Sequence, residues 1–325
     1  MRKRFFALAL SAMLFALCAP ALAQQSGKPY RIGVIHQGGP YQAVVDGLRE
    51  GLRQFAADGR KQFLLDVRNA KGDLRMIEEA ARTFERDNLN LIYAVTTSVA
   101  TAVNNVTSKI PIVFAVGTSP VDSGLVPSLV RPGGRLTGVE YSTLDLTGKR
   151  LEILKEIVPK LSRVITFYNP SNPVAVEAIE LARAAARGLG VKLIERHATS
   201  VEELRQALRT LKPKDADAYF YTSDAMVMSQ AQLVIDTATS ELLPSMFAEQ
   251  SLVTMGGLAS YGQNFREIGR LSAKYVQKVL TGAHPKDLRV ERIDKYELAI
   301  NLKTAKQIGL IIPLNLLARA DKVIR

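Results

Sequence analysis

Cysteine is almost absent from this 325-residue chain, which has a single one, Cys18, near its N-terminus. The residues that follow it can form no disulfide and no cysteine-ligated metal site. Attachment of a lipid at Cys18 is disfavoured, because Leu17 occupies the position where lipoprotein processing requires a small side chain. We interpret Cys18 as part of a segment that is removed, which leaves a chain held together by its apolar core.

Histidine is also scarce, with three residues, His36, His197 and His284, that lie far apart in the sequence. No two of them have the spacing of a metal-binding helix, and the chain lacks the glycine-rich loops that bind phosphates or dinucleotides. Residues 257–262 contain glycine and serine, but not at the spacing of a hydrolase nucleophile elbow. These absences predict no catalytic residues, no metal and no cofactor. An exported hydrolase with catalytic residues distant in sequence remains an alternative.

Only one long apolar run is present, residues 5–17, and it is shorter than the roughly 20 residues that span a bilayer. Three basic residues, 2–4, precede it, and the small residues Ala21 and Ala23 follow it. This order is typical of a secretory signal peptide. We predict a signal peptide over residues 1–23, cleavage after Ala23 and a periplasmic protein. An uncleaved membrane anchor is the alternative.

Acidic residues are outnumbered, since 31 Asp and Glu stand against 43 Lys and Arg, for a net charge of +12. Three of the basic residues lie in the predicted signal peptide, which leaves +9 for the rest of the chain. These charges are scattered over many predicted helices, whereas nucleic-acid binding typically uses a dense basic block. We expect a solvated basic surface and no nucleic-acid partner.

What the chain does contain is a repeated alternation of short apolar runs with longer amphipathic stretches. Strands are expected at 31–36, 63–67, 91–95 and 110–116, with helices at 41–57 and after Asp73. After a Pro- and Gly-rich stretch, strands are expected at 163–168, 191–195 and 218–221, with helices at 172–188, 201–211 and 225–239. Continuous apolar strands joined by helices are typical of parallel sheets covered on both faces. We predict an α/β fold with two lobes joined by a hinge, each lobe a parallel sheet flanked by helices.

The last third of the chain does not begin a third lobe. It contains one amphipathic stretch, 262–281, and one further strand, 298–302, which are expected to pack on the two existing lobes. The chain would then cross between the lobes more than once. We predict that lobe 1 comprises residues 24–141 plus about 260–284, and lobe 2 comprises residues 142–259 plus about 285–325.

Small hydroxyl and amide side chains recur where the predicted strands end. The carboxyl ends of parallel strands face a crevice in which ligands bind, and helices that begin there offer free N–H groups suited to a carboxylate. We predict ligand binding by ten residues at these ends: Gln37, Tyr41, Thr97, Ser98, Thr118, Ser119, Asn169, Asn172, Ser223 and Asp224. Tyr168 and Tyr221 lie inside strands and are expected in the core or in the cleft wall. For any one Ser, Thr, Asn or Asp, the alternative is that it caps its own helix.

Asp224 is the acid in this set, and two interpretations of it remain open. It follows a predicted strand directly, where it can pair with a ligand ammonium group, and it equally occupies the position of a helix N-cap. The set as a whole favours an amino acid or a similar small carboxylate as the ligand. A long sugar is disfavoured, because the chain has no Trp to stack on sugar rings.

Several short segments, in a fixed order, resemble those of a known family. They lie at 69–73, 110–116, 123–126, 132–138, 168–170, 257–262, 268–269, 279–282, 300–301, 305–313 and 320–321. With these segments the chain resembles the substrate-binding components of ABC transporters, which have a type I periplasmic-binding-protein fold. Within that family it resembles the branch that includes tryptophan and tyrosine receptors. The resemblance extends over essentially the whole chain after the predicted signal peptide.

This resemblance implies a hinge that closes on a small-molecule ligand, no catalysis, and delivery of the ligand by a monomer to an ABC permease in the inner membrane. Two departures concern the ligand: Ser119 stands where many relatives have an acid, and residues 223–225 read Ser-Asp-Ala where relatives often have Asp-Asn. A receptor that feeds a sensor or signalling protein is the main alternative. A cytoplasmic gene regulator with the same effector fold is disfavoured by the predicted signal peptide.

Overall fold

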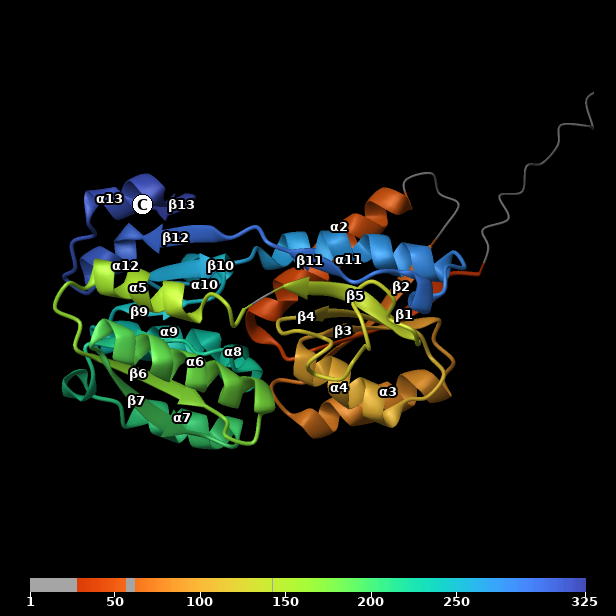
Figure 1. The fold of residues 1–325 in the computed structure, drawn as a ribbon, viewed down its shortest axis with the longest axis horizontal. Coiled ribbons are helices and arrows are strands. Elements are labelled where there is room, and N and C mark those ends of the chain that lie inside the picture. The colour runs from red at the N-terminus through yellow and green to blue at the C-terminus, as the bar shows by residue number, and fades with distance from the viewer. Residues whose placement is uncertain (1–27, 57–61, 142) are drawn as a thin grey trace, which may run out of the picture.

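The structure is a computed structural model, and it describes residues 28–56, 62–141 and 143–325. The predicted signal peptide, residues 1–23, lies outside the described residues. Two lobes lie side by side, and each has a central sheet between layers of helices (Figure 1). The two-lobed α/β fold predicted from the sequence is confirmed.

The first lobe is built on a six-stranded sheet in which all neighbouring strands pair in parallel. Across the sheet its strands are β11 (Glu291–Ile293), β5 (Leu136–Tyr141), β4 (Ile112–Val116), β3 (Leu91–Val95), β1 (Tyr30–His36) and β2 (Phe63–Asn69). The inner strands β3 and β4 are buried along their whole length. Burial on both faces explains why they are unbroken apolar runs in the sequence.

Two helices cover each face of this sheet. On one face lie α2 (Gln42–Phe55) and α11 (Phe265–Leu280), and on the other lie α3 (Leu74–Arg86) and α4 (Thr97–Val106). A short 3-10 turn, η1 (Gly39–Tyr41), leads into α2, and another, η3 (Pro285–Asp287), follows α11. Glycine lets α2 and α11 approach closely, because a Cβ on Gly269 would lie 2.0 Å from the Val44 carbonyl oxygen. Helix α11, from the C-terminal third of the chain, therefore belongs to the first lobe.

The second lobe has a seven-stranded sheet. Across it the strands are β13 (Lys322–Ile324), β12 (Glu297–Asn301), β10 (Ala259–Gly262), β9 (Ser245–Phe247), β8 (Ala218–Phe220), β6 (Arg163–Tyr168) and β7 (Lys192–His197). All neighbours pair in parallel except β10 and β12, which are antiparallel. The sheet is thus mainly parallel rather than wholly parallel, because β12 enters it from the first lobe and runs against β10.

The helices of the second lobe also lie on both faces of its sheet. On one face are α5 (Thr147–Ile157), α6 (Pro173–Leu189), α12 (Leu302–Gln307) and α13 (Leu314–Arg319), and on the other are α7 (Val201–Arg209), α8 (Ala225–Ser229) and α9 (Ala231–Ser240). The remaining elements are α10 (Gln250–Thr254) and the 3-10 turn η2 (Pro213–Asp215). Residues 225–239, expected as one helix, form two, because the backbone leaves the helical conformation at Gln230 (φ −106°, ψ 24°).

The chain passes between the lobes three times, after β5, after β10 and after β11. The third crossing differs from the sequence prediction, which places residues 285–325 in lobe 2. Strand β11 instead pairs with β5 in the first sheet. It is held there by Val290, which is buried in the core of the first lobe and whose N–H donates to the Leu129 carbonyl oxygen (2.7 Å). The first lobe therefore extends to about residue 293.

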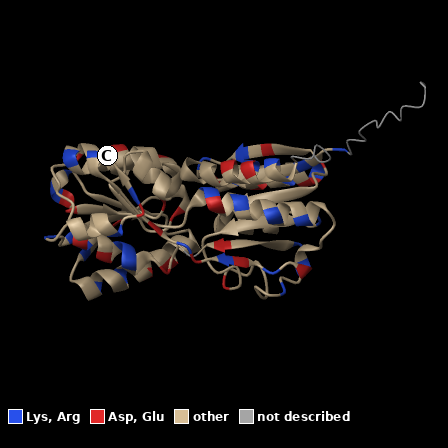
Figure 2. Cartoon of the chain, turned by 90° about the horizontal axis from the view of Figure 1, so that it is seen from above, with Lys and Arg blue, Asp and Glu red and all other residues tan. Residues whose placement is uncertain are grey.

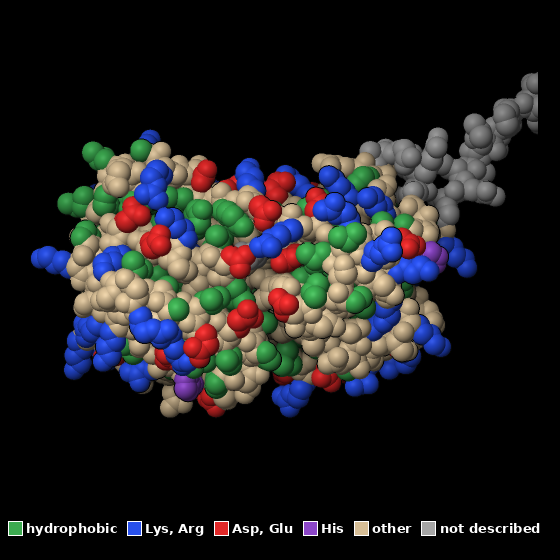
Figure 3. Space-filling view, in the orientation of Figure 1, with side chains coloured by type: hydrophobic (Ala, Val, Ile, Leu, Met, Phe, Trp, Pro, Cys, Tyr) green, Lys and Arg blue, Asp and Glu red, His purple; other side chains and the backbone are tan. Residues whose placement is uncertain are grey.

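Charged side chains of both signs are spread over the two lobes (Figure 2), and on the face drawn in Figure 3 acidic side chains lie along the middle, where the lobes meet. Arg292 on β11 forms ion pairs with Asp145 (2.7 Å) and Asp294 (3.2 Å) in the links between the lobes. Within the described ranges, no helix combines the length and the apolar character that a membrane span requires. In the same part of the chain, no three His, Cys, Asp or Glu side chains are grouped so that they could hold a metal ion.

Candidate functional site

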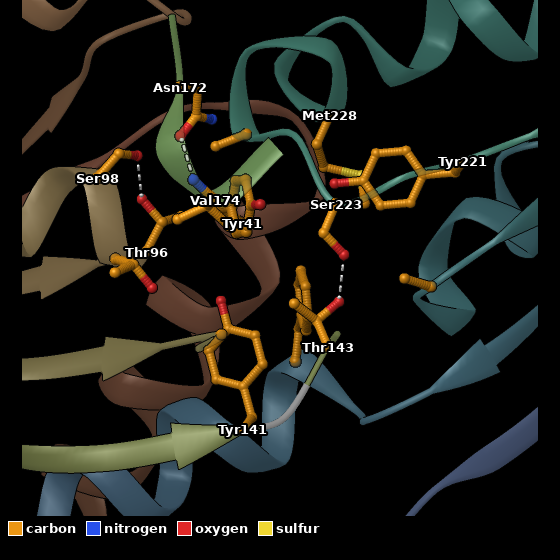
Figure 4. A pocket seen from close by; sticks show the side chains of 15 residues that line it. Tyr41, Thr96, Ser98, Tyr141, Thr143, Asn172, Val174, Tyr221, Ser223 and Met228 are labelled. Carbon is orange, nitrogen blue, oxygen red and sulfur yellow. Dashed lines mark hydrogen bonds between the residues drawn. The ribbon is translucent and has the colours of Figure 1, made fainter. Parts of the chain in front are cut away.

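A cavity lies between the two lobes, where the parallel strands of both sheets end. The volume open to the centres of water-sized molecules is about 40 Å³, so the cavity is small in this arrangement of the lobes. The residues that line it come from both lobes and from the link that follows β5 (Figure 4). A ligand held here would contact both lobes at once.

Four aromatic side chains form much of the cavity wall: Tyr41 from η1, Tyr141 from the end of β5, Tyr221 after β8 and Phe265 from the start of α11. The rings of Tyr41 and Phe265 stack with centroids 5.4 Å apart and planes at 13°, and Tyr141 meets Phe265 edge-on at 5.6 Å. Burial raises the pKa of each of the three tyrosines well above its ordinary value, so the phenols are neutral at physiological pH. The wall therefore presents uncharged aromatic surface with a few hydroxyl groups.

The loop between β3 and α4 supplies the hydroxyl groups of the first lobe. Thr96 has a positive φ of 93° and caps α4 through its side chain, and Thr97 and Ser98 follow at the cavity. Gln37 Nε2 donates to Ser98 Oγ (3.1 Å), and the hydroxyls of Thr97 and Thr118 share a hydrogen bond (2.9 Å). The first turn of α4 thus begins at the cavity, where the helix dipole favours an anionic group.

The second lobe contributes Asn172 and Ser223. Asn172 caps α6, because its side-chain oxygen accepts a hydrogen bond from the Val174 N–H (3.2 Å). Ser223 Oγ lies 2.9 Å from the Thr143 hydroxyl, and this pair is drawn in Figure 4. The Thr143 N–H in turn donates to the Gly117 carbonyl oxygen in the first lobe (3.0 Å). Thr143 therefore joins the two lobes at the wall of the cavity.

Asp224 is fully buried and is not among the residues that line this cavity. Its carboxylate accepts hydrogen bonds from the N–H groups of Met226 (2.8 Å) and Val227 (3.0 Å) in α8 and of Asn169 (2.9 Å) after β6. Burial raises the pKa of Asp224, and these hydrogen bonds act in the opposite direction. Of the two interpretations that the sequence leaves open, the geometry supports the helix cap.

Five of the ten residues predicted from the sequence line the cavity: Tyr41, Thr97, Ser98, Asn172 and Ser223. Gln37 and Thr118 lie behind them as hydrogen-bond partners of Ser98 and Thr97. Asn169 and Gln37 line a wider groove outside the cavity, which Thr97, Ser98 and Asn172 also line. The Ser119 hydroxyl accepts a hydrogen bond from the Asp122 N–H (3.2 Å) within its own loop. The structure thus brings seven of the ten predicted residues together. Five line the cavity, and Gln37 and Thr118 lie behind them.

Three prominent lining residues are missing from the sequence prediction: Tyr141, Thr143 and Phe265. Tyr141 ends β5, a strand that the adjoining Pro- and Gly-rich stretch conceals in the sequence. The rule that site residues lie at strand ends would find Tyr141 and Thr143 once that strand is recognised. Phe265 begins α11 directly after its cap, Asn264, and an aromatic residue there indicates a core position as readily as a cavity wall.

Comparison with known proteins agrees with this architecture. The family described as ABC transporter substrate binding protein matches residues 32–324. A tyrosine-binding protein of Clostridioides difficile (strain R20291) is 30% identical over 247 residues, which cover 76% of this chain and 70% of that protein.

Two solved structures are similar over most of both chains. An ABC domain from Streptococcus pneumoniae in complex with L-Trp has a TM-score of 0.80 at 24% identity, over 91% of this chain and 100% of that one. The ligand-free, open structure of a substrate-binding protein with adhesive properties from Clostridium difficile has a TM-score of 0.59 at 27% identity, over 91% and 99%. Since the family match spans nearly all of the described residues, this chain belongs to the ABC transporter substrate-binding protein family.

Proposed function

We propose that this chain is the receptor of an importer, that it binds an aromatic amino acid between its lobes, and that it delivers this ligand to an ABC permease. It acts by binding alone, as a monomer, in the periplasm after residues 1–23 have been removed. The similar tyrosine-binding protein supports an aromatic amino acid as the ligand class. The Ser and Thr hydroxyls of the cavity suit the carboxylate and ammonium groups that all amino acids share.

The observation that carries this proposal is the combination of an aromatic wall and hydroxyl groups in one cavity. Tyr41, Tyr141 and Phe265 form one contiguous set of rings, against which a further ring can stack or pack edge-on. The hydroxyl groups of Thr97, Ser98 and Ser223 also line the cavity and suit the polar end groups of an amino acid. An aromatic side chain and a carboxylate are the two ends of one molecule in tyrosine, tryptophan and phenylalanine.

Closure of the lobes is the mechanism of capture. A ligand that contacts both lobes stabilises the closed arrangement and shifts an existing open–closed equilibrium towards it. The three chain crossings between the lobes form the hinge. The permease then distinguishes loaded from empty receptor by the relative position of the two outer surfaces.

Titration calorimetry with L-tyrosine, L-tryptophan, L-phenylalanine, L-leucine and glucose tests the proposal. We expect the aromatic amino acids to bind most tightly and glucose not to bind. Tyr41→Leu should lower the affinity for aromatic ligands about two- to tenfold, which corresponds to the interaction energy of one aromatic pair. The affinity for L-leucine should fall less. Binding of the sugar alone, or no preference for aromatic side chains, would refute the proposal.

Tyr30→Leu is the matched control. Tyr30 also stacks on a phenylalanine of the first lobe, Phe63, with centroids 5.8 Å apart, but it does not line the cavity. Its replacement should leave every affinity unchanged. Genes for a permease and an ATPase beside this one would support import, whereas a sensor gene in their place would support a signalling receptor.

A further inference from the structure

Arg150, in the first turn of α5, is the largest fully buried side chain of the described residues. Its Nη2 donates to the Thr143 carbonyl oxygen (2.5 Å) and, at 3.4 Å, to the Thr147 hydroxyl. Its Nε and Nη1 have no hydrogen-bond partner, and no carboxylate of the described chain forms an ion pair with it. Arg150 is therefore a buried guanidinium with two free donor atoms.

A buried charge without a counter-charge is unusual, because the protein interior solvates it far less well than water does. Burial lowers the pKa of Arg150 to about 10, and the nearby Tyr221 opposes this shift. Since about 10 is still well above neutral pH, the guanidinium stays positively charged. The structure thus contains a positive charge that the described residues leave uncompensated.

The position of Arg150 says where its counter-charge can enter. Thr143, whose carbonyl oxygen it holds, lines the cavity and shares a hydroxyl hydrogen bond with Ser223. Tyr221, which lies near enough to Arg150 to affect its pKa, lines the same cavity. The guanidinium therefore lies directly behind the part of the cavity wall that these three residues form.

The two buried acids of the second lobe within the described residues, Asp224 and Glu249, are already engaged. The Asp224 carboxylate accepts three backbone hydrogen bonds, and that of Glu249 is bound to the backbone and side chain of Ser251. Arg150 does not itself line the cavity, and an anion bound at the wall in front of it would supply the missing counter-charge. The Thr143 and Ser223 hydroxyls are placed to donate to such an anion while Arg150 supplies the charge.

We propose that Arg150 is the residue that makes this receptor select a free α-carboxylate, with the ligand's carboxylate bound at the Thr143–Ser223 hydroxyl pair in front of the guanidinium. The proposal rests on the proposed function in one respect, that the ligand is an amino acid. Arg150 acts through electrostatic attraction and by fixing the Thr143 carbonyl group. Uncharged amides and esters of the same amino acid are rejected, because they leave the buried charge uncompensated.

The test compares L-tyrosine with L-tyrosinamide by titration calorimetry, since the two differ only in one end group, a charged carboxylate in the acid and a neutral amide in the other. The wild type should prefer the acid about ten- to hundredfold, the range expected for a hydrogen bond to a charged group. Arg150→Met should reduce this preference by at least about tenfold, and Arg150→Lys, which keeps the charge, should retain part of it. If Arg150→Met weakens acid and amide by the same factor, Arg150 has only a structural role and the proposal is overturned.

Arg135→Met is the control for loss of a structural arginine. Arg135 lies in the first lobe, where its guanidinium is bonded to Asn104, Thr107 and Ile110, away from the cavity. Its replacement should lower stability and leave the acid-to-amide ratio unchanged. If Arg150→Met does not fold, two other results test the proposal. They are the acid-to-amide preference of Arg150→Lys and the position of the ligand carboxylate in a crystal structure of the wild-type complex. A ligand carboxylate remote from Thr143 and Ser223 overturns the proposal.

Failure of the proposed function can be distinguished from failure of the proposal for Arg150. If the wild type binds no aromatic amino acid, a thermal-shift screen of all amino acids identifies the ligand, and the acid-to-amide ratio is measured with that compound. A ratio that falls in Arg150→Met supports the role of Arg150 although the ligand class was wrong. If no amino acid binds to the wild type, both proposals are overturned.

Discussion

Gly39 in the first lobe lies directly against the backbone of Met228 in the second. A Cβ atom built on Gly39 would lie 2.5 Å from the Met228 carbonyl oxygen, closer than side-chain and backbone atoms approach in proteins. Gly72, in the loop before α3, meets the second lobe in a similar way, with a built Cβ 2.9 Å from Ser229 Oγ. The arrangement of the lobes in this structure therefore depends on the absence of side chains at Gly39 and Gly72.

Gly39→Ala should hinder closure without harming the lobes themselves. The added methyl group collides with a backbone atom only when the lobes meet, so the open form tolerates it. We expect at least about a tenfold loss of ligand affinity, equivalent to about 1.4 kcal/mol against the closed state. Calorimetry measures the affinity, and small-angle scattering should show a smaller ligand-induced decrease in the radius of gyration.

Gly124→Ala is the control for backbone strain. Gly124 also has a positive φ, 71° against 56° for Gly39, but a Cβ built on it meets nothing within 4 Å. Both substitutions should lower the melting temperature of the ligand-free protein slightly, since left-handed backbone costs an alanine roughly 1–2 kcal/mol. Equal ligand affinities in the two variants would show that Gly39 does not govern closure.

Asp224→Ala should destabilise the protein more than it weakens ligand binding. The change leaves three backbone N–H groups without an acceptor, at Asn169, Met226 and Val227. Loss of a helix cap costs about 1 kcal/mol, and a buried unsatisfied donor about 1–3 kcal/mol more. Urea unfolding should therefore show a loss of about 2–4 kcal/mol, with affinity changed less than about threefold. A tenfold loss of affinity in Asp224→Asn, at nearly wild-type stability, would instead support pairing with the ligand's ammonium group.

Glu249 should make the stability of the protein depend on pH between about 4.5 and 7. Burial raises its pKa to about 7, against hydrogen bonds from Ser251 that lower it. Because the folded protein holds this proton more tightly than the unfolded chain, the stabilisation is complete below about pH 4.5. This stabilisation is lost as the pH rises through 7, and it amounts to on the order of 3 kcal/mol of the free energy of unfolding.

Urea unfolding of the wild type and of Glu249→Gln at several pH values between 5 and 8 checks this. The variant should be nearly as stable as the wild type at pH 5 and more stable at pH 8. The comparison is needed because burial also lowers the pKa of His36 to about 4, which makes stability rise with pH between about 4 and 6.5. Parallel pH profiles for the two proteins would exclude Glu249 as the group responsible.

The parts of the fold that follow from local rules were predictable from the sequence. Strands β3 and β6 have the predicted bounds, because buried parallel strands are continuous apolar runs. Asp73 and Ser200, residue types favoured at helix N-caps, cap α3 and α7, since each side chain accepts a hydrogen bond from a backbone N–H within the first turn. Three-residue strands such as β9 and β11 have no periodic signal of their own, and neighbouring strands determine where they pair.

The candidate site was predictable only in part, because some of its residues are brought together only by tertiary packing. Ser98 and Asn172 lie where strand-end chemistry predicts them, on loops of the two sheets. The aromatic wall arises where four distant segments meet, and no local pattern reports that meeting. Arg150 shows the same limit, because an arginine in an amphipathic helix is expected at the surface, yet tertiary packing buries it completely.

The three crossings of the chain also constrain how this protein can change over evolution. Neither lobe is encoded by one continuous stretch of gene, since α11 and β11 complete the first lobe after the second has begun, and β12 and β13 then complete the second. A recombination event at a single boundary would join incomplete halves, each with an exposed core. Exchange of a whole lobe would therefore need several boundaries at once, whereas substitutions in the loops around the cavity leave both lobes complete.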